Sequence, residues 1–412
     1  MKPVCITGPK GHISASISLP LSKSICNRLL ILQAIEPSIG ITALSSADDT
    51  RLMQVSLRSN EKTVDLKNAG TCVRFLTAYF AAAGKHKIIT GSSRMKSRPI
   101  KPLVDALRAM GATISYLEKE GFLPVEIKQS KLYGGEVAID SAQSSQFSSA
   151  LLLISPLLQH GLILHLGEHI ASYPYIQMTI GLLKQAGVNI VQQENTIIVT
   201  PGQKLKGSII KPEADWSAAS YWYEIAALSN SCELFLNGLT PESLQGDTII
   251  HLWMKNHFGV ETRFDGGGAW LTKNNETGIK NGAELDLLHN PDLAPAIAAS
   301  ACGIGIGVKL TGLQTLALKE SDRLNALTKE LSKTGAHIKI SNNNQIEILP
   351  DADKVTHASL HMQSYSDHRM AMAFAPLSLC FDNIKLDDGL CVEKSYPEFW
   401  HHLQQAGFSI TG

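Results

Sequence analysis

The sequence repeats one short phrase five times, and this repeat constrains the fold more than any other feature. In each copy an apolar helix end is followed by glycine, by a small or apolar residue, and then by a strand. The glycines alternate between spacings of 76 and 72 residues, a regularity that indicates repeated structural units. Each glycine fits the left-handed position that ends a helix at low steric cost. The five are Gly111, Gly187, Gly259, Gly335 and Gly407.

A second phrase lies between these glycines, in which a polar cluster opens a helix rich in alanine and serine. The run 294–301, for example, reads Ala-Pro-Ala-Ile-Ala-Ala-Ser-Ala. Such helices can pack closely on all sides, so we expect them to be buried. The polar clusters begin near residues 21, 68, 144, 215, 291 and 367.

Together the two phrases define six units of helix, strand, helix and hairpin. The first unit is short, because residues 51–67 have helix and strand character but lack the glycine phrase. Six units predict an α/β protein of two domains with three units each, with helices inside and sheets outside. We expect an N-terminal domain at 14–212 and a C-terminal domain formed by 1–13 and 213–412.

Composition narrows the class of protein. Lys and Arg number 37 and so do Asp and Glu, whereas a protein that holds nucleic acid normally carries a basic excess. The seven cysteines are dispersed without a C-x-x-C pair, which favours a reducing compartment and neither disulfides nor zinc. No apolar run reaches membrane-spanning length, and the first residues lack a signal-peptide pattern. We therefore expect a cytoplasmic protein with no nucleic-acid or membrane partner.

The helix starts carry residues suited to binding anions. A helix N-terminus offers unpaired N–H groups and a partial positive charge. Ser24 lies next to Lys23 and one turn from Arg28, and Gly70 precedes Arg74 on the next such helix. Ser, Thr, Asn and Asp are also ordinary helix caps, so both interpretations stay open for any single start. Six such starts in one architecture favour a cleft for small polyanions. Its expected cations are Lys23, Arg28, Arg98, Lys319, Arg323, Arg369 and Lys394.

One metal-site pattern is rejected. His165, Glu168 and His169 match the H-x-x-E-H spelling, which needs a helix to bring its two imidazoles onto one face. The alternating run 162–166 predicts a strand instead. We therefore expect no metal ion at this position.

These residues match a known family in order and spacing. The chain resembles the 3-phosphoshikimate 1-carboxyvinyltransferases, or EPSP synthases, from Leu19 to Phe399. The most specific strings are Lys-Glu-Ser-Asp-Arg at 319–323 and Asp-His-Arg-Met-Ala-Met at 367–372. Ser-Lys-Ser at 22–24 and Asn-Ala-Gly-Thr at 68–71 add to them. The family fold, two inside-out domains of three βαβαββ units, agrees with the repeat count.

The resemblance implies transfer of the enolpyruvyl group of phosphoenolpyruvate to the 5-hydroxyl of shikimate 3-phosphate, with release of phosphate and without a cofactor or metal. It implies Asp292 as the base for the attacking hydroxyl and Glu320 as the proton donor to carbon, with Lys23 also catalytic. The substrates would lie between the two domains of a monomer. The implied phosphoenolpyruvate ligands are Lys23, Gly70, Arg98, Arg323, Arg369 and Lys394. The remaining implied substrate ligands, mostly for shikimate 3-phosphate, are Ser24, Arg28, Ser144, Ser145, Gln146, Ser172, Asp292, Thr315 and Lys319.

Three departures from the family pattern concern loops. Leu21 stands where the family usually has glycine, so its backbone must avoid a positive φ. Glu213-Ala214-Asp215 replaces the usual Pro-Gly-Asp, and residues 51–67 are short. A degenerate, poorly active anion-binding homologue is therefore one alternative. The other is the sister enolpyruvyltransferase acting on UDP-N-acetylglucosamine, which normally relies on a reactive cysteine; the stretch 91–99 contains none.

Overall fold

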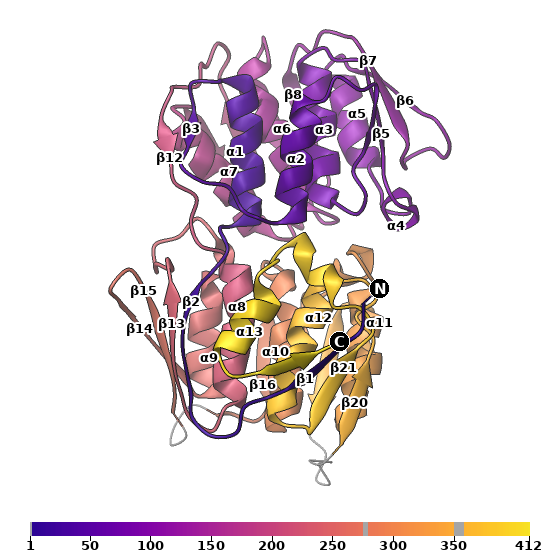
Figure 1. The fold of residues 1–412 in the computed structure, drawn as a ribbon. Helices are drawn as coiled ribbons and strands as arrows, with labels where there is room; N and C mark the ends of the chain where they lie inside the picture. The colour runs from indigo at the N-terminus through magenta and orange to yellow at the C-terminus, as the bar shows by residue number, and fades with distance from the viewer. Residues whose placement is uncertain (1, 275–278, 350–357) are drawn as a thin grey trace. The chain divides into compact units, whose positions relative to one another are not determined.

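The structure is a computed structural model that describes residues 2–274, 279–349 and 358–412. The contacts between Cα atoms divide the chain into two units (Figure 1). The N-terminal unit comprises Ser22–Pro212, and the C-terminal unit comprises Met1–Leu21 together with Glu213–Gly412. No helix in the described residues is long and apolar enough to cross a membrane.

Each four-stranded sheet of the described chain has the same plan, in which a parallel pair of strands is extended by two antiparallel strands. The N-terminal unit has two such sheets and one parallel pair. Their strand orders are β4 (Thr63–Asp65), β5 (Lys87–Thr90), β7 (Val125–Lys128), β6 (Thr113–Tyr116); β8 (Gly135–Ala138), β9 (Leu162–His165), β11 (Thr196–Val199), β10 (Ile190–Gln193); and β3 (Gly40–Ile41), β12 (Ile209–Ile210).

The C-terminal unit has three four-stranded sheets in the described chain. In one of them, strands from the two ends of the chain form the antiparallel pair, because β1 pairs with β22. The strand orders are β2 (Ile13–Ser18), β13 (Cys232–Asn237), β15 (Gly268–Lys273), β14 (Val260–Asp265); β16 (Ala283–Asp286), β17 (Val308–Thr311), β19 (Gln345–Leu349), β18 (His337–Ser341); and β20 (Ser359–Met362), β21 (Asn383–Leu386), β1 (Val4–Thr7), β22 (Ser409–Thr411).

The structure begins the N-terminal unit later than residue 14, where the sequence placed it. Strand β2 runs parallel to β13 from Ile13 to Ser18, so its backbone hydrogen bonds tie it to the C-terminal unit. The chain leaves that unit only after Leu21. Strand pairing is a long-range choice, and nothing in residues 13–18 specifies the partner.

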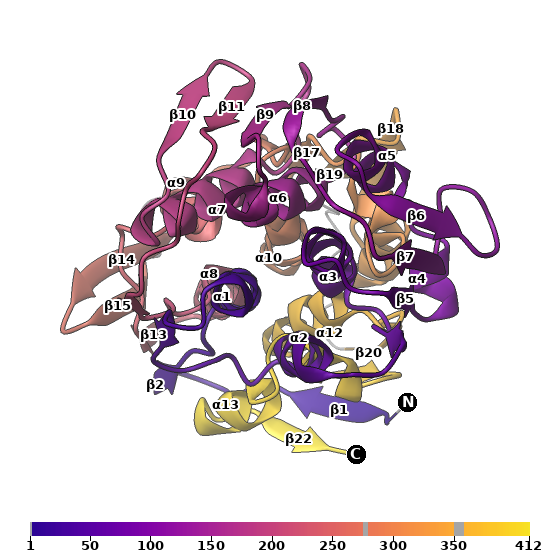
Figure 2. The same cartoon turned by 90° about the horizontal axis from the view of Figure 1, so that it is seen from above.

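In each unit the helices lie inside and the strands lie at the rim, as Figures 1 and 2 show. The central helices are almost wholly buried, as expected for helices rich in small residues. They are α1 (Lys23–Ile35), α3 (Gly70–Ala82) and α6 (Ser145–Ile154) in the N-terminal unit, and α8 (Trp216–Leu228), α10 (Ala294–Ile304) and α12 (His368–Phe374) in the C-terminal unit. The longer helices outside them are α2 (Asp48–Arg58), α5 (Lys101–Ala109), α7 (Tyr173–Gln185), α9 (Ile250–Phe258), α11 (Arg323–Leu331) and α13 (Phe399–Gln405), and α4 (Ser93–Lys96) is a single turn.

The predicted backbone features are confirmed. All five repeat glycines have positive φ, from 70° at Gly259 to 108° at Gly111, and so end their helices in the left-handed region. Leu21 is absent from the positive-φ residues of the described chain, as its side chain requires. The short first unit contains α2 and β4 but only the two-stranded sheet β3–β12.

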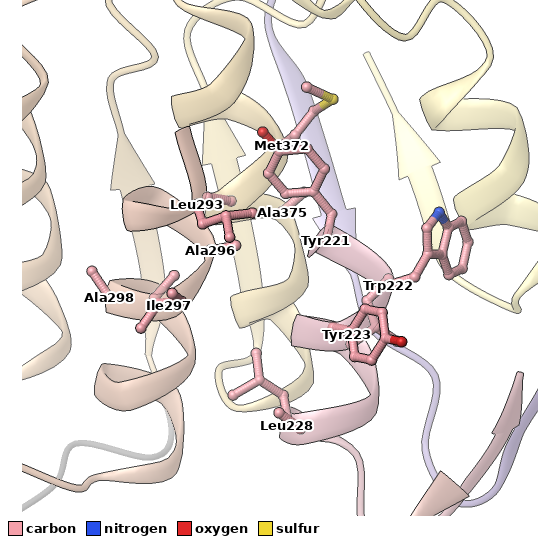
Figure 3. Packing of buried hydrophobic residues seen from close by; sticks show 14 of the residues in the cluster. Tyr221, Trp222, Tyr223, Leu228, Leu293, Ala296, Ile297, Ala298, Met372 and Ala375 are labelled. Carbon is pink, nitrogen blue, oxygen red and sulfur yellow. The ribbon is translucent and has the colours of Figure 1, made fainter. Parts of the chain in front are cut away.

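Helix α8 supplies the largest side chains of the C-terminal core. Trp216, Tyr221, Trp222 and Tyr223 are each at most 1% exposed. Figure 3 shows Tyr221 beside Met372 of α12, whereas Trp222 and Tyr223 point to other sides of α8. The aromatic residues of α8 thus contact several neighbouring elements, while the alanines of α10 allow close packing.

Candidate active site

Four cations and three carboxylates form an ion-pair network in the C-terminal unit. Asp292, on the 3-10 helix η3 (Pro291–Leu293), lies at its centre. Its Oδ1 is 3.2 Å from Lys319 Nζ and 3.0 Å from a terminal nitrogen of Arg323. Its Oδ2 accepts a hydrogen bond from Arg369 at 2.8 Å. The structure thus brings together residues that the motifs had singled out in three separate segments of the sequence.

Glu320 forms the second part of this network. Its Oε1 is 2.7 Å from Lys394 Nζ, at the end of the 3-10 helix η7 (Leu390–Lys394). Its Oε2 accepts from Arg323 at 2.9 Å. Arg323 is 1% exposed and links Glu320 to Asp292, so the two candidate proton-transfer groups share one guanidinium.

Asp367 anchors the network, and the sequence analysis gave it no role. It caps α12 by accepting from the backbone N–H of Arg369, and it also takes Arg323 with both carboxylate oxygens at 2.8 and 3.1 Å. Ser321 donates to it at 2.9 Å. Its place at the head of the Asp-His-Arg string was the available signal, because an aspartate before a helix is a common cap.

Charge neighbours determine the protonation of Asp292. Burial would raise the pKa of this carboxyl, but Arg369, Lys319 and Arg323 together hold the pKa well below its usual range. Asp247 responds in the opposite direction: burial, and then the nearby charge of Asp292, raise its pKa. Asp247 is 2% exposed and accepts from Asn290 at 3.1 Å and from Ser217. Nothing in the sequence pattern had indicated it.

In the N-terminal unit, Gly70 lies at the start of α3 against two guanidinium groups. A Cβ atom there would lie 2.9 Å from a terminal nitrogen of Arg98 and 3.2 Å from one of Arg74. Both arginines are buried, at 8% and 3% exposure. Arg74 donates to the carbonyls of Gly70 and Pro99. A side chain at residue 70 would therefore make the ends of these two arginine side chains move.

Lys23 lies at the start of α1 and pairs with a carboxylate that the sequence analysis did not identify. Its Nζ is 3.1 Å from Asp49 Oδ2 on α2, and both side chains are largely buried. The helix α1 begins at Ser22 without a side-chain cap. A cation and uncapped N–H groups thus share one helix start.

Arg28 is buried, unlike a ligand on the surface of a cleft. It is 2% exposed and donates to Thr179 Oγ1 at 2.7 Å and Ser149 Oγ at 3.2 Å, besides the carbonyls of Ser24 and Tyr175. Burial lowers its pKa to about 10. These bonds join α1 to α6 and α7, so Arg28 stabilises the packing of the helices that carry the other candidate ligands.

The remaining polar residues of the N-terminal unit lie at helix starts. Ser144 caps α6, Ser145 is the first residue of that helix, and Gln146 donates to Thr71 Oγ1 of α3 at 3.2 Å. Ser172 precedes α7 with a left-handed backbone at φ 56°, which is uncommon for serine. Ser144 and Gln146 are therefore placed close to the start of α3.

Thr315 stands apart from the ion-pair network in the bonds that the structure shows. It is 5% exposed, and its hydroxyl makes no hydrogen bond within the described residues. Its role as a substrate ligand stays a prediction.

Two helix starts in the C-terminal unit are ordinary caps, one of the two interpretations that the sequence left open for any single start. Asp215 and Asp367 cap α8 and α12 with their own carboxylates. A capping carboxylate satisfies the helix N–H groups and opposes a bound anion. In this unit the candidate groups for binding an anion are therefore the cations that carboxylates hold.

Comparison with known proteins supports the interpretation of these strings. A family model described as EPSP synthase (3-phosphoshikimate 1-carboxyvinyltransferase) matches residues 52–403. A 3-phosphoshikimate 1-carboxyvinyltransferase of Bacteroides fragilis is 40% identical over 402 residues, with 97% of each chain covered. The chain belongs to the EPSP synthase family. A second member, from Mannheimia succiniciproducens, is 33% identical over 95% of this chain and 96% of its own.

The fold also matches a solved EPSP synthase, that of Acinetobacter baumannii. The TM-score is 0.77 at 21% identity, with 100% of both chains covered. The two-domain α/β fold expected for an EPSP synthase is thus confirmed.

Proposed function

We propose that this chain transfers the enolpyruvyl group of phosphoenolpyruvate to the 5-hydroxyl of shikimate 3-phosphate, releasing phosphate, as a transferase of the shikimate pathway and aromatic amino-acid biosynthesis. The observation that carries this proposal is the network around Asp292 and Glu320, in an EPSP synthase family member. Two carboxylates for proton transfer, surrounded by cations for two anionic substrates, suit this reaction.

The reaction needs one proton transfer from oxygen and two at carbon. The 5-hydroxyl oxygen attacks C2 of phosphoenolpyruvate, and we assign its proton to Asp292, while C3 gains a proton from Glu320 in its acid form. Elimination then returns a proton from C3 to the Glu320 carboxylate as the bond from C2 to the phosphate oxygen breaks, and the proton on Asp292 leaves with the released phosphate. Lys23 would stabilise charge on the phosphate as it leaves.

The ion pairs of Asp292 give substrate binding a second effect. With its pKa held low by Arg369 and Lys319, Asp292 is a weak base. A phosphate or carboxylate that takes over these cations would raise the pKa of Asp292 and strengthen the base. Binding and activation of the base are then the same event.

Both units contribute ligands in this proposal. Lys23, Gly70, Arg98, Arg323, Arg369 and Lys394 hold phosphoenolpyruvate, and Ser24, Arg28, Ser144, Ser145, Gln146, Ser172, Thr315 and Lys319 position shikimate 3-phosphate or the groups around it. We further propose that the protein is a cytoplasmic monomer. Size-exclusion chromatography with light scattering tests the oligomeric state.

A phosphate-release assay tests the function. The purified protein should release phosphate only when both phosphoenolpyruvate and shikimate 3-phosphate are present. Replacing shikimate 3-phosphate by UDP-N-acetylglucosamine should abolish release. Release from phosphoenolpyruvate with the nucleotide sugar, but not with shikimate 3-phosphate, would assign the chain to the sister reaction. No release in either mixture would indicate an anion-binding homologue without turnover.

A further inference from the structure

A buried aromatic chain lies directly after Lys394 in the C-terminal unit. Tyr396, two residues beyond Lys394, is 0% exposed. The indole N–H of Trp222 on α8 donates to the Tyr396 hydroxyl at 3.2 Å. The hydroxyl lies 2.8 Å from Nδ1 of His402 on α13. Three side chains from three segments thus meet at a single oxygen atom.

The direction of the first hydrogen bond follows from the groups themselves. An indole N–H only donates, so the hydroxyl oxygen of Tyr396 accepts from Trp222. The hydroxyl proton can then be donated to Nδ1 of His402 in the neutral tautomer that carries its proton on Nε2. Burial lowers the pKa of His402, with Glu398 opposing and His401 adding to this effect, and this favours the neutral ring. The indole N–H, the hydroxyl and Nδ1 thus each have a partner.

This hydroxyl can restrain Lys394 because the intervening backbone is short and bonded. The backbone N–H groups of Ser395 and Tyr396 both donate to the carbonyl of Val392, at 3.0 and 2.8 Å. Tyr396 is the first wholly buried side chain after Lys394. Its ring also packs edge-on against Phe399, 5.5 Å between centroids, and Phe399 packs against Tyr221 at 6.0 Å.

We propose that Tyr396 is a positioning residue for phosphoenolpyruvate binding: its hydroxyl, fixed between Trp222 and His402, places the end of η7 and so holds Lys394 in the cation network. The inference rests on the proposed function, in which Lys394 is a phosphoenolpyruvate ligand. The chemistry needs the hydroxyl and not only the ring. A phenylalanine would keep the packing but leave a buried N–H and a buried ring nitrogen without partners, which favours rearrangement of this segment.

The chain offers a matched control. Tyr223 on the same helix as Trp222 is also 0% exposed, and its hydroxyl lies 3.1 Å from Thr262 Oγ1 on β14. Figure 3 shows that its ring points to a different side of α8 from Trp222. Tyr223→Phe therefore removes one buried hydroxyl and one hydrogen bond from the same unit without affecting the segment that carries Lys394.

The experiment compares Tyr396→Phe and Tyr223→Phe by steady-state kinetics and thermal unfolding. We expect Tyr396→Phe to raise KM for phosphoenolpyruvate about tenfold while kcat and KM for shikimate 3-phosphate change less than about threefold. Tyr223→Phe should lower Tm comparably and leave all three kinetic constants unchanged. Equal KM effects from both variants, or none from Tyr396→Phe, would overturn the proposal.

A double-mutant cycle shows whether Tyr396 acts through Lys394. In a Lys394→Met background, Tyr396→Phe should cause no further rise in KM, whereas a full additional tenfold rise would overturn the proposal. Trp222→Phe removes the donor to the hydroxyl together with part of a buried ring, and should also raise KM for phosphoenolpyruvate.

Failure of the inference and failure of the function are separable. Active wild-type protein with unaffected variants contradicts the inference alone. If the wild type gives no phosphate, calorimetric binding of phosphoenolpyruvate in the presence of shikimate 3-phosphate replaces KM in the same comparison. Absence of that binding in the wild type overturns both proposals.

Discussion

The two units use the same repeat but place charge at their inner helices in opposite ways. In the N-terminal unit α1 and α3 begin without side-chain caps, and Arg98 and Arg74 lie against the start of α3. In the C-terminal unit aspartates cap α8 and α12, and Asp367 also holds Arg323. One unit therefore offers helix N–H groups to an anion, and the other offers cations that an anion must take from carboxylates.

The buried polar groups differ in the same sense. Arg28 in the N-terminal unit is bonded to hydroxyls and carbonyls, whereas Arg323 in the C-terminal unit is bonded to three carboxylates. Inner helix α8 also buries Glu224, whose two oxygens have no hydrogen-bond partner in the described chain. The charge of Arg28 is thus stabilised by neutral dipoles, and that of Arg323 by ion pairs.

The largest expected effect comes from the centre of the ion-pair network. Asp292→Asn should lower kcat about 1,000-fold, because it removes the proposed base, while shikimate 3-phosphate still binds. Phosphate release and calorimetry measure the two quantities. Asp322→Asn is the control, since the half-buried Asp322 caps α11. Turnover of Asp292→Asn within tenfold of the wild type would refute the assignment of the base.

Arg28, which is buried in the N-terminal unit, should mainly support stability. Arg28→Lys loses the planar fork that donates to Thr179, Ser149 and two carbonyls, and should lower the free energy of unfolding by about 2 kcal/mol. Urea unfolding measures this loss. Arg58→Lys, at the exposed end of α2, should change stability by less than about 0.5 kcal/mol. Similar losses from both variants would contradict the structural role of Arg28.

Glu224 makes the stability of the C-terminal unit depend on pH. Burial raises its pKa well above the usual range, so the folded protein retains a proton that the unfolded chain releases above pH about 4.5. Stability therefore falls as pH rises. In the wild type, the free energy of unfolding should fall by up to about 1.4 kcal/mol per pH unit because of Glu224, and Glu224→Gln should abolish this fall. Urea unfolding between pH 5 and 8 measures it.

A matched carboxyl sharpens this test. Glu330 is also 0% exposed, but it accepts from Tyr365 at 2.8 Å and from the backbone N–H of Gln363 at 2.9 Å, and pairs with Lys333. Glu330→Gln should lower the free energy of unfolding, because it removes bonded oxygen acceptors. Parallel pH curves for the wild type and Glu224→Gln would show that Glu224 ionises without cost.

The smallest expected effect concerns the start of α3. Gly70→Ala would place its Cβ 2.9 Å from the Arg98 guanidinium, and the end of this side chain must move. We expect KM for phosphoenolpyruvate to rise about fivefold, equivalent to about 1 kcal/mol, with kcat nearly unchanged. Gly40→Ala is the control, because its Cβ would meet only the exposed side chain of Ile209. An unchanged KM for phosphoenolpyruvate in Gly70→Ala would show that Arg98 does not contribute to its binding.

Local patterns account for what the sequence predicted of the site. Asp292, Lys319, Glu320, Arg323 and Arg369 were recognised because they lie in two short, specific strings and beside a helix start. Their partners were harder to identify. Asp49 and Asp247 carry no motif, and each acquires its significance from a side chain 26 or 43 residues away.

The sequence by itself determined the repeated architecture and the positions where helices end. Glycine spacing predicted six units, and all five repeat glycines end their helices at positive φ because only glycine adopts that conformation at low cost. Tertiary structure alone decided that strand β2 joins the C-terminal unit, that Arg28 is buried, and that Trp222, Tyr396 and His402 meet at one hydroxyl. The physical reason is the distance along the chain over which each interaction acts. Backbone conformation depends on neighbouring residues, whereas strand partners, burial and charge pairing depend on segments that only folding brings together.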